Sequence, residues 1–297
     1  MRLAVIGAGI MGRNYLRAAK AAGISIAFIA DKNPEAAAAA AQEYGCAVKT
    51  QPQAADMDAA VIAVPTAFHT AVALPLLKAG IPCLVEKPFV ATPAEGRALI
   101  DAATAAGVVL QVGHIERFNP GMEALAVSAI DPARITALAA RRMGPASARV
   151  TDISVVSDLM VHDLDIVLAL KPLPVVTVEA HGNADHAEAK LTFTDGTVAT
   201  LTASRVSANR VRTLDVTVGD ATAGGQTYHL DYIAKSLLTA GPWAQNTSVH
   251  GGDALGAELT HFISCIKDKT TPRVTGDAAL AAMMLVWRIE AALGISK

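Results

Sequence analysis

The sequence has few cysteines, few aromatic residues and almost no net charge. Cys46, Cys83 and Cys265 are an odd number with no CxxC spacing, which argues against a disulfide framework and a zinc site. The formal net charge is −2 and aromatic residues make up 4% of the chain, so nothing indicates a nucleic-acid or acidic-membrane surface. We therefore expect a protein of the reducing cytoplasm, without nucleic-acid or membrane partners.

Long apolar runs are also missing. No apolar stretch reaches the roughly 18 residues that a membrane-spanning helix needs. The N-terminal MRLAVIGAGIMG is interrupted early by glycines, so it indicates a strand and a turn rather than a signal peptide. What the chain does have is 297 residues of which 52% are hydrophobic, which allows a sizeable core and favours two domains.

The first part of the chain, residues 1–118, alternates strand-like and helix-like segments. The expected strands are LAVIG, SIAFIAD, DAAVIAV, CLVE and VVLQVG. The expected helices cover residues 10–22, 34–44, 67–79 and 93–106. Continuous apolar strands separated by helices are typical of a parallel sheet covered on both faces. The sequence therefore predicts an α/β N-terminal Rossmann domain with a doubly wound parallel sheet.

The second part, residues 119–297, has a different pattern. Strands follow one another in ITALAARRM, VVTVEAHG, EAKLTFT, TVATLTASRV, TLDVTVG and QTYHLDY. The TDGT segment around Asp195 and Gly196 is a strong hairpin signal. Helices are expected at 157–170, 253–268 and 276–293. We predict an α+β domain with a largely antiparallel open sheet that binds substrate. Its Thr- and Val-rich strands indicate a surface for a homodimer or homotetramer.

The segment GAGIMG joins the first strand to the first helix. Gly7 would permit the tight turn, Gly9 a close approach of a pyrophosphate, and Gly12 close packing of helix on strand. Ile10 and Met11 lie in the same loop and are further candidate cofactor contacts. Asp31 follows at the end of the second strand, where a carboxylate binds the adenosine ribose. The alternative is a glycine-rich turn without a ligand.

Asp31 also indicates which dinucleotide is bound. A carboxylate repels the 2′-phosphate of NADP, so NAD is the expected cofactor. Lys32 weakens this preference because its ammonium group partly offsets the repulsion. NADP therefore remains the less favoured alternative.

Two polar groups interrupt the end of a buried strand in LVEKPFV. Glu86 and Lys87 lie at its carboxyl end, where open α/β sheets bind their ligands. Lys87 is a candidate hydrogen-bond donor to a substrate hydroxyl near the nicotinamide, and Pro88 stiffens its backbone. The alternative is a solvated lysine beside a turn proline.

A second polar group of residues lies on the helix SDLMVHDLDIVLAL. Asp158, His162 and Asp165 are spaced by four and three residues, so they fall on one helical face. His162 can accept a hydroxyl proton as hydride leaves the same carbon, with Asp158 orienting the sugar or the imidazole. A solvated face, a core histidine and a metal site are the alternatives.

GAGIMG together with VEKP resembles the glucose–fructose oxidoreductase, inositol dehydrogenase and MocA family. The resemblance extends over VPTAFHTAVALPLLKAG and implies that Lys87 lies in the active site. Cofactor contacts from Pro65, His69, Glu86 and Lys87 are expected on the same basis. Asp158 and His162 match the family's DxxxH motif, although Met160 stands where a glycine is usual. The resemblance also implies chemistry without a metal.

The segments GHIERFNPG and AARRMGP provide candidate substrate contacts. Polar side chains between the predicted domains suit a polyhydroxylated ligand, and arginine suits phosphate. Together with Lys87, Asp158 and His162, the expected substrate-binding residues are His114, Arg117, Asn119 and Arg141. Salt bridging at a domain seam is the alternative for the arginines.

GHIERFNP and SDLMVHDLDIVL resemble a subgroup of nucleotide-sugar dehydrogenases. These oxidise the 3-hydroxyl of UDP-N-acetylglucosamine on the route to 2,3-diamino sugars of lipid A in lipopolysaccharide biosynthesis. The expected function is an NAD-dependent oxidoreductase of a sugar CH–OH group. The alternatives are a UDP-N-acetylglucosaminuronate 3-dehydrogenase, an inositol or free-sugar dehydrogenase, and a dinucleotide-binding sensor without turnover.

Overall fold

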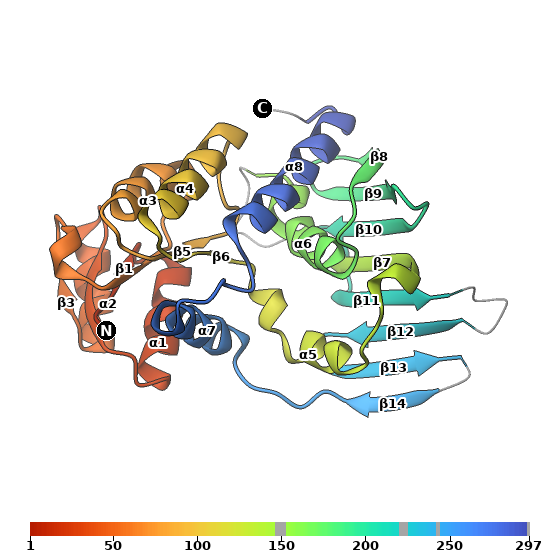
Figure 1. Ribbon diagram of the computed structural model, residues 1–297, viewed down its shortest axis with the longest axis horizontal. Coiled ribbons are helices and arrows are strands. Elements are labelled where there is room, and N and C mark those ends of the chain that lie inside the picture. Colours follow the sequence, from red (N-terminus) through yellow and green to blue (C-terminus); the bar gives the residue numbers. More distant parts are fainter. Residues whose placement is uncertain (146–152, 220–224, 242–243, 296–297) are drawn as a thin grey trace. The chain divides into compact units, whose positions relative to one another are not determined.

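The chain divides into two compact units, which we call unit 1 and unit 2. The computed structural model describes residues 1–145, 153–219, 225–241 and 244–295 (Figure 1). Unit 1 contains residues 1–118 and 252–280, and unit 2 contains residues 119–251 and 281–297. Residues 252–280, which the sequence pattern places with the second domain, thus belong with unit 1. No helix among the described residues is both long and apolar enough to cross a membrane.

Unit 1 is built on a parallel sheet with the strand order β3-β2-β1-β4-β5-β6. The strands are β1 (Leu3–Ile6), β2 (Ile26–Ala30), β3 (Ala47–Val48), β4 (Ala59–Ile62), β5 (Cys83–Glu86) and β6 (Leu110–Gly113). Every residue of β1, β4, β5 and β6 is buried, as expected for a sheet covered on both faces. The order reverses between β1 and β4, and such a switch point is where open α/β sheets bind ligands. The predicted doubly wound Rossmann fold is therefore confirmed.

Helices follow the strands, and their ends are set by local capping. Those of unit 1 are α1 (Ile10–Ala21), α2 (Pro34–Tyr44), α3 (His69–Lys78), α4 (Pro93–Ala106) and α7 (Ala254–Asp268), with short turns η1 (Ala54–Asp56), η2 (Thr66–Phe68) and η3 (Ile115–Phe118). The Asn33 side chain accepts hydrogen bonds from the first amides of α2, and Thr92 forms a capping box with Glu95 at α4. Proline occupies the first position of both helices, which is compatible with the helix because that amide has no intrahelical partner.

The helix α7 completes unit 1 from a distant part of the sequence. Leu255, Leu259 and Phe262 are buried in one core cluster with residues of β1 and α1, beside which α7 packs (Figure 1). The chain after α7 then lies along the sheet edge, where Thr275 forms an antiparallel bridge with Gln111 of β6. This edge of the sheet is therefore covered by the returning chain.

Unit 2 contains a sheet with the order β14-β13-β12-β11-β7-β10-β9-β8. Its strands are β7 (Ile135–Met143), β8 (Val175–Gly182), β9 (His186–Phe193), β10 (Val198–Ser204), β11 (Val211–Val218), β12 (Gln226–Asp231), β13 (Ser236–Ala240) and β14 (Gln245–Ser248). Its helical elements are α5 (Pro120–Val127), η4 (Pro132–Arg134), η5 (Val156–Met160), α6 (Val161–Leu170) and the later part of α8 (Gly276–Ala292). All described strand pairs are antiparallel except β7 with β10, so the predicted largely antiparallel sheet is confirmed.

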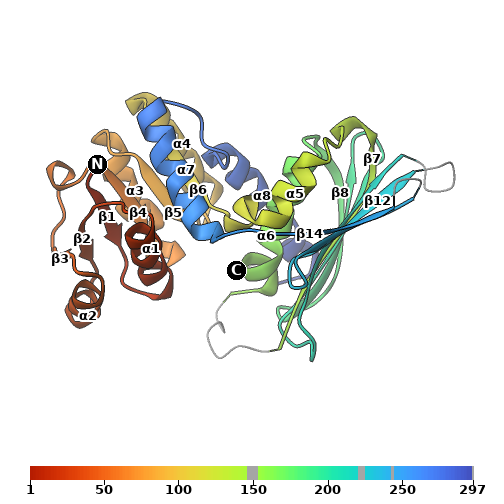
Figure 2. The same ribbon diagram turned by 90° about the horizontal axis from the view of Figure 1, so that it is seen from below.

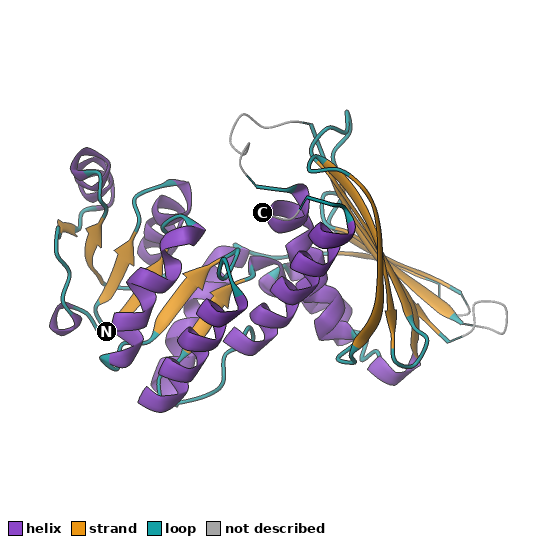
Figure 3. Cartoon of the chain, turned by 90° about the horizontal axis from the view of Figure 1, so that it is seen from above, coloured by secondary structure: helices purple, strands orange, loops and turns teal. Residues whose placement is uncertain are grey.

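The sheet of unit 2 has two different faces. α5 and α6 lie against one of them (Figure 2), and Figure 3 shows helices beside this face. Leu191, Leu201 and Leu214 are buried and alternate with exposed residues, which places them on this side. Lys190 and Thr200 point to the other side and are exposed. In the described part of the chain no element covers this second face (Figure 2). The alternation predicted from the sequence thus separates a core face from an open face.

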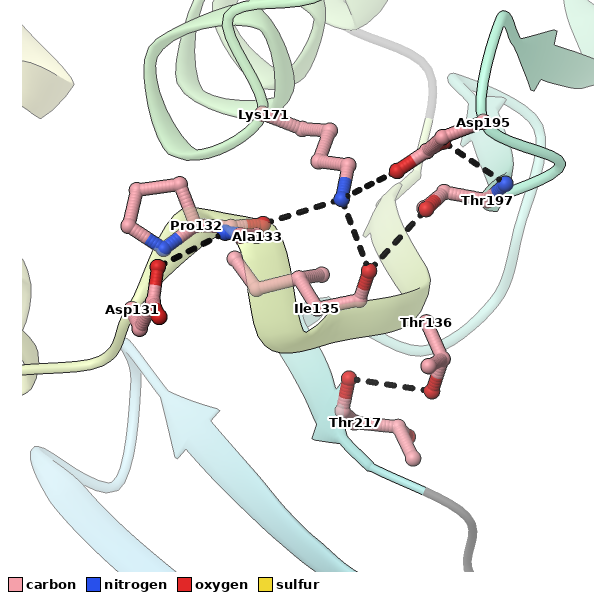
Figure 4. A network of polar contacts seen from close by, with 9 residues as sticks. All are labelled: Asp131, Pro132, Ala133, Ile135, Thr136, Lys171, Asp195, Thr197 and Thr217. Atoms are coloured by element: carbon pink, nitrogen blue, oxygen red, sulfur yellow. Dashed lines mark hydrogen bonds and ion pairs between the residues drawn. The ribbon is translucent and has the colours of Figure 1, made fainter.

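A buried lysine ties α6 to the sheet at the start of β7. Lys171 directly follows α6 and is 1% exposed. Its ammonium donates to the backbone oxygens of Pro132 and Ile135, at 2.9 and 3.0 Å, and pairs with Asp195 at 2.6 Å (Figure 4). Asp195 lies in the predicted Asp-Gly hairpin between β9 and β10, and the neighbouring ammonium lowers its pKa to about 2. One side chain therefore fixes three segments of unit 2.

Candidate active site

The glycine loop between β1 and α1 is shaped by close backbone contacts. Gly7 has a φ of +111°, and a Cβ there would lie 2.4 Å from the backbone oxygen of Ala63. A Cβ on Gly12 would lie 1.8 Å from the backbone oxygen of Gly7. Both positions therefore exclude side chains for reasons internal to the fold.

Gly9 differs from the other two glycines of the loop. It caps the N-terminus of α1 with φ −69° and ψ −169°, a conformation open to any residue. Apart from the residues that adjoin it in the loop and helix, no described atom lies within 4 Å of where its Cβ would be. Ile10, next in sequence, is 57% exposed at the start of the helix. The loop and the first helical amides thus leave an open position suited to a phosphate, with Met11 in the same turn.

Asp31 connects the end of β2 to the glycine loop. Its Oδ2 accepts a hydrogen bond from the Ala8 amide at 2.6 Å, and its Oδ1 accepts one from the Asn33 amide at 2.7 Å. Each carboxylate oxygen retains a further lone pair for a ribose hydroxyl. The Lys32 ammonium lies 5.2 Å from the centre of the Phe68 ring, within the range of a cation–π contact.

A cavity of about 460 Å³ opens at the carboxyl ends of β1, β2 and β4. Its walls are mainly apolar, with three polar side chains from Asp31, Lys32 and Thr50. The remaining lining residues are Ile6, Ala30, Pro52, Val64, Pro65, Phe68, Val72, Pro75 and Leu76. Apolar walls with a few convergent polar groups are typical of a small-ligand site. The residues present fit the adenosine half of a dinucleotide, and Pro65 is one of the wall residues.

The end of β5 directs two adjacent side chains differently. Glu86 is buried, with its Oε1 2.8 Å from the Tyr15 hydroxyl and its Oε2 accepting the Lys87 amide at 3.1 Å. Burial raises the pKa of Glu86, against the opposing effects of the Tyr15 hydrogen bond and of Lys87. Lys87 is half-buried, and its peptide bond to Pro88 is cis. Glu86 thus lies beneath the loop that presents Lys87.

His69, the first residue of α3, is buried between two backbone carbonyls. Its Nδ1 lies 3.0 Å from the oxygen of Phe89 and its Nε2 lies 2.9 Å from the oxygen of Val64. Burial lowers the pKa of His69. Since Val64 lines the cavity and Phe89 follows the Lys87–Pro88 turn, the imidazole connects the cavity wall to this turn.

The carboxylate–histidine segment lies in unit 2, and a π-helical turn interrupts it. η5 contains Asp158 and α6 begins directly after it, so the uniform helix expected over 157–170 is not observed. Asp158 and His162 are half-buried, whereas Asp165 is 2% exposed. Met160, at the position where the family usually has glycine, is fully buried. A π turn has a wider period than an α-helix, so the α-helical spacing assumed between Asp158 and His162 does not apply, whereas His162 and Asp165 both lie in α6 at the expected spacing.

Two sets of contacts, one to β7 and one to α8, hold this segment against the rest of unit 2. The Arg142 guanidinium donates to both oxygens of Asp163, at 3.0 and 2.8 Å, and both residues are buried. Glu290 of α8 accepts hydrogen bonds from the hydroxyls of Ser154 and Ser157, the latter at 2.7 Å. His162 therefore lies on a helix fixed from β7 on one side and from α8 on the other.

The other predicted substrate residues have varied environments. His114 is buried after β6. The Arg117 guanidinium donates to the backbone oxygen of Arg273 at 3.2 Å. Asn119 caps α5 by accepting the Gly121 amide at 2.9 Å.

Arg141 alternates with Arg142 along β7. Because Arg142 points toward α6, Arg141 points to the open face of the sheet, where it is exposed. The structure thus brings Arg142 beside the histidine helix, and it places Arg141 on the opposite side of the sheet.

Sequence reasoning missed two buried groups behind Lys87. The Tyr15 hydroxyl lies 2.8 Å from Glu86 Oε1 and 2.9 Å from Glu258 Oε2. Glu258 is the polar member of an otherwise apolar face of α7, beside Leu255, Leu259 and Phe262. A lone carboxylate on such a face was the available signal, but the sequence does not show which partner it meets.

Comparison with known proteins places the chain in a family. Residues 1–114 match the oxidoreductase family with an NAD-binding Rossmann fold. UDP-N-acetylglucosamine 3-dehydrogenase of Acidithiobacillus ferrooxidans is 36% identical over 304 residues, which cover 96% of each protein. Inositol 2-dehydrogenase 2 of Saccharopolyspora erythraea is 32% identical over 61% of this chain and 57% of its own length.

A solved structure of UDP-N-acetylglucosamine 3-dehydrogenase from Acidithiobacillus ferrooxidans has the same fold throughout. It superposes with a TM-score of 0.91 at 33% identity and covers 99% of this chain and 97% of that one. Similarity of this extent in sequence and structure includes both units. The chain belongs to the glucose–fructose oxidoreductase, inositol dehydrogenase and MocA family of oxidoreductases.

Proposed function

We propose that this oxidoreductase oxidises the 3-hydroxyl of UDP-N-acetylglucosamine with NAD, supplying a 3-keto sugar for a 2,3-diamino sugar of lipid A. The observation that carries the proposal is the similarity to UDP-N-acetylglucosamine 3-dehydrogenase over 96% of both chains. A match of this length extends well beyond the dinucleotide fold of residues 1–114. Inositol dehydrogenases match a smaller share of the chain, which makes a free polyol the second candidate.

Bound NAD would lie along the carboxyl ends of β1, β2 and β4. Its pyrophosphate would occupy the open position at Gly9, and its adenosine would occupy the cavity lined by Asp31. The Asp31 carboxylate would accept the ribose hydroxyl and repel a 2′-phosphate. Lys32 is near the Phe68 ring, so its charge lies at the cavity wall. These contacts favour NAD over NADP.

The proposed chemistry assigns one task to each of three side chains. When bound, NAD would supply the nicotinamide that takes the hydride of the sugar carbon. His162 accepts the hydroxyl proton, leaving a carbonyl on the sugar and an imidazolium on the enzyme. Lys87 donates a hydrogen bond to the developing alkoxide, and Asp158 orients the sugar or the imidazole. This requires Lys87 of unit 1 and His162 of unit 2 to meet at one substrate.

The substrate's diphosphate and sugar hydroxyls need further donors and acceptors. We assign these contacts to His114, Arg117 and Asn119, which flank the chain passage between the units. Arg141 leaves β7 on the open face of the sheet, so its role at a substrate requires a second chain packed on that face. A homodimer or homotetramer through this face is therefore part of the proposal. The face carries both charge signs, with Glu188 beside Lys190, as self-association requires.

The test is the formation of NADH with UDP-N-acetylglucosamine, compared with UDP-N-acetylglucosaminuronate, free hexoses and inositols. Replacing Lys87 by Met, or His162 by Gln, should lower kcat by at least about a hundredfold while NAD still binds. Lys78→Met and His250→Gln are matched controls at exposed positions and should retain full activity. Full activity of both site variants would refute the assignment. Binding of NAD without turnover of any sugar would favour the sensor.

A further inference from the structure

A tyrosine hydroxyl joins two buried carboxyl groups behind Lys87 in unit 1. Tyr15 and Glu258 are fully buried, and Glu86 is 5% exposed. The Tyr15 oxygen lies 2.8 Å from Glu86 Oε1 and 2.9 Å from Glu258 Oε2. Tyr15 lies on α1, Glu86 on β5 and Glu258 on α7. The two glutamates are 71 and 243 positions from Tyr15 in the sequence.

The geometry fixes the number of protons in this group. A tyrosine hydroxyl has one hydrogen, which can be donated to one carboxylate only. The second short contact needs a hydrogen of its own, because two lone pairs at this distance repel each other. One carboxyl group must therefore be a carboxylic acid that donates to the Tyr15 oxygen.

The proton belongs to the pair of carboxyl groups. Glu86 Oε1 has the shorter contact with Tyr15, and Glu86 Oε2 accepts the Lys87 amide at 3.1 Å. These contacts favour a Glu86 carboxylate, whereas burial raises the pKa of Glu86. Glu86 and Glu258 therefore share one proton across the Tyr15 hydroxyl.

The chain of hydrogen bonds is packed without spare space. A Cβ on Gly113 of β6 would lie 3.1 Å from Glu86 Oε1 and 3.2 Å from the Tyr15 oxygen. Gln111, also on β6, donates to the backbone oxygen of Glu258 at 3.2 Å. Of the other titratable groups on these elements, Arg17 pairs with Asp253, and His261 accepts the Arg273 amide.

We infer that Glu258, Tyr15 and Glu86 form one hydrogen-bonded chain that shares a single proton between its two carboxyl groups and positions the backbone of Lys87. Glu86 in turn accepts the Lys87 amide. The hydrogen-bonded chain connects α1, which follows the glycine loop, to the residue that the proposed function places at the substrate. Glu258 is thus a positioning residue whose importance for turnover rests on that proposed function.

Infrared spectroscopy at pH 7 tests the proton independently of turnover. A buried carboxylic acid has a C=O stretch distinct from that of a carboxylate, so the wild type should show this band. Glu258→Gln and Glu86→Gln should each abolish the band, because the glutamine amide donates to the Tyr15 oxygen and the remaining carboxyl group can ionise, whereas the surface control Glu43→Gln should retain it. Absence of the band in the wild type would overturn the inference. A band that survives in both Glu258→Gln and Glu86→Gln would also overturn it.

Kinetics of the same variants test the positioning. Glutamine at 258 keeps a donor toward Tyr15, so kcat should stay within about twofold of the wild type. Leucine at 258 removes the donor, and kcat should fall by at least about tenfold, as expected when a reacting group is displaced. Equal loss in both variants, or in neither, would contradict the positioning role.

The two proposals can fail separately. A wild type that shows the band but oxidises no sugar refutes the proposed function and leaves the proton assignment in place. In that case NAD titration replaces kcat, since displacement of the Lys87 turn should weaken binding in Glu258→Leu and not in Glu258→Gln. A wild type that oxidises the nucleotide sugar but lacks the band refutes the present inference alone.

Discussion

Replacing Gly9 by alanine should separate cofactor binding from folding. Gly9 and Gly12 lie three positions apart in one loop, and each substitution adds a single methyl group. At Gly9 the methyl would meet no described atom within 4 Å, and the backbone angles suit any residue. At Gly12 it would lie 1.8 Å from the Gly7 oxygen. The same chemical change is therefore tolerated by the fold at one position and not at the other.

The expected magnitudes follow from these distances. Gly9→Ala should change the free energy of unfolding by less than about 1 kcal/mol, because alanine mainly restricts the unfolded chain. In Gly12→Ala the new Cβ and the backbone oxygen of Gly7 have to separate from 1.8 Å to at least 3.0 Å, which requires displacement of the backbone. Forced backbone shifts of this kind cost about 1–3 kcal/mol or more. The affinity of Gly9→Ala for NAD should fall by at least about tenfold, or roughly 1.4 kcal/mol, because its methyl occupies the place of the pyrophosphate.

Urea unfolding and calorimetric titration with NAD measure the two effects separately. Gly252→Ala is the matched control, since its added methyl also meets no described atom and its backbone is unstrained. This control should keep both stability and affinity. If Gly9→Ala binds NAD as tightly as the wild type, the open position at the helix N-terminus is not the pyrophosphate site.

Three further predictions concern charged groups. Asp31→Asn should raise the NADP-to-NAD ratio of kcat/KM by at least about tenfold, because the repulsion of a 2′-phosphate is removed. Steady-state kinetics with both cofactors measures this ratio. An unchanged ratio would mean that the carboxylate is not at the ribose. The lowered pKa of Asp195, about 2, implies that its pair with Lys171 stabilises the fold above the ordinary aspartate range and is lost as the pH falls toward 2. Urea midpoints of the wild type should therefore fall in that window more than those of Asp195→Asn, and parallel curves would contradict this. Arg142→Met should cost about 3–5 kcal/mol in thermal or urea unfolding, because Asp163 stays buried without its guanidinium, and Asp163→Leu in the same chain should restore part of the loss.

Most of the architecture could be predicted from the sequence because its signals are periodic. The predicted α2 and α4 coincide with the observed helices, since Asn33 and Thr92 cap them and Pro and Gly mark their ends. β7 and β8 have the predicted bounds. The missed strands β3, β13 and β14 have no such pattern: β3 has two exposed residues, and β14 is the polar, exposed QNTS. Pairing with a neighbouring strand, which no local pattern encodes, forms these elements.

The candidate site could be predicted less completely from the sequence than the fold. Gly7, Gly9, Gly12 and Asp31 could be identified because their spacing is tied to a strand–turn–helix unit. The contacts of His69 with two backbone carbonyls could not, because they depend on which segments the fold brings together. Alternation along β7 predicts that Arg141 and Arg142 point to opposite faces. Only the structure shows that Arg142 is the one beside the histidine helix.

The return of residues 252–280 to unit 1 has a consequence for biosynthesis. A ribosome that has released the first 118 residues has supplied every strand of the nucleotide-binding sheet, yet Glu258, the second partner of Tyr15, and the α7 residues of the apolar cluster around Leu16 are still missing. They arrive on α7 only when most of the polypeptide has emerged. We therefore expect a nascent chain stopped before α7 to be captured by chaperones or digested by proteases, and protection to begin once α7 has left the exit tunnel.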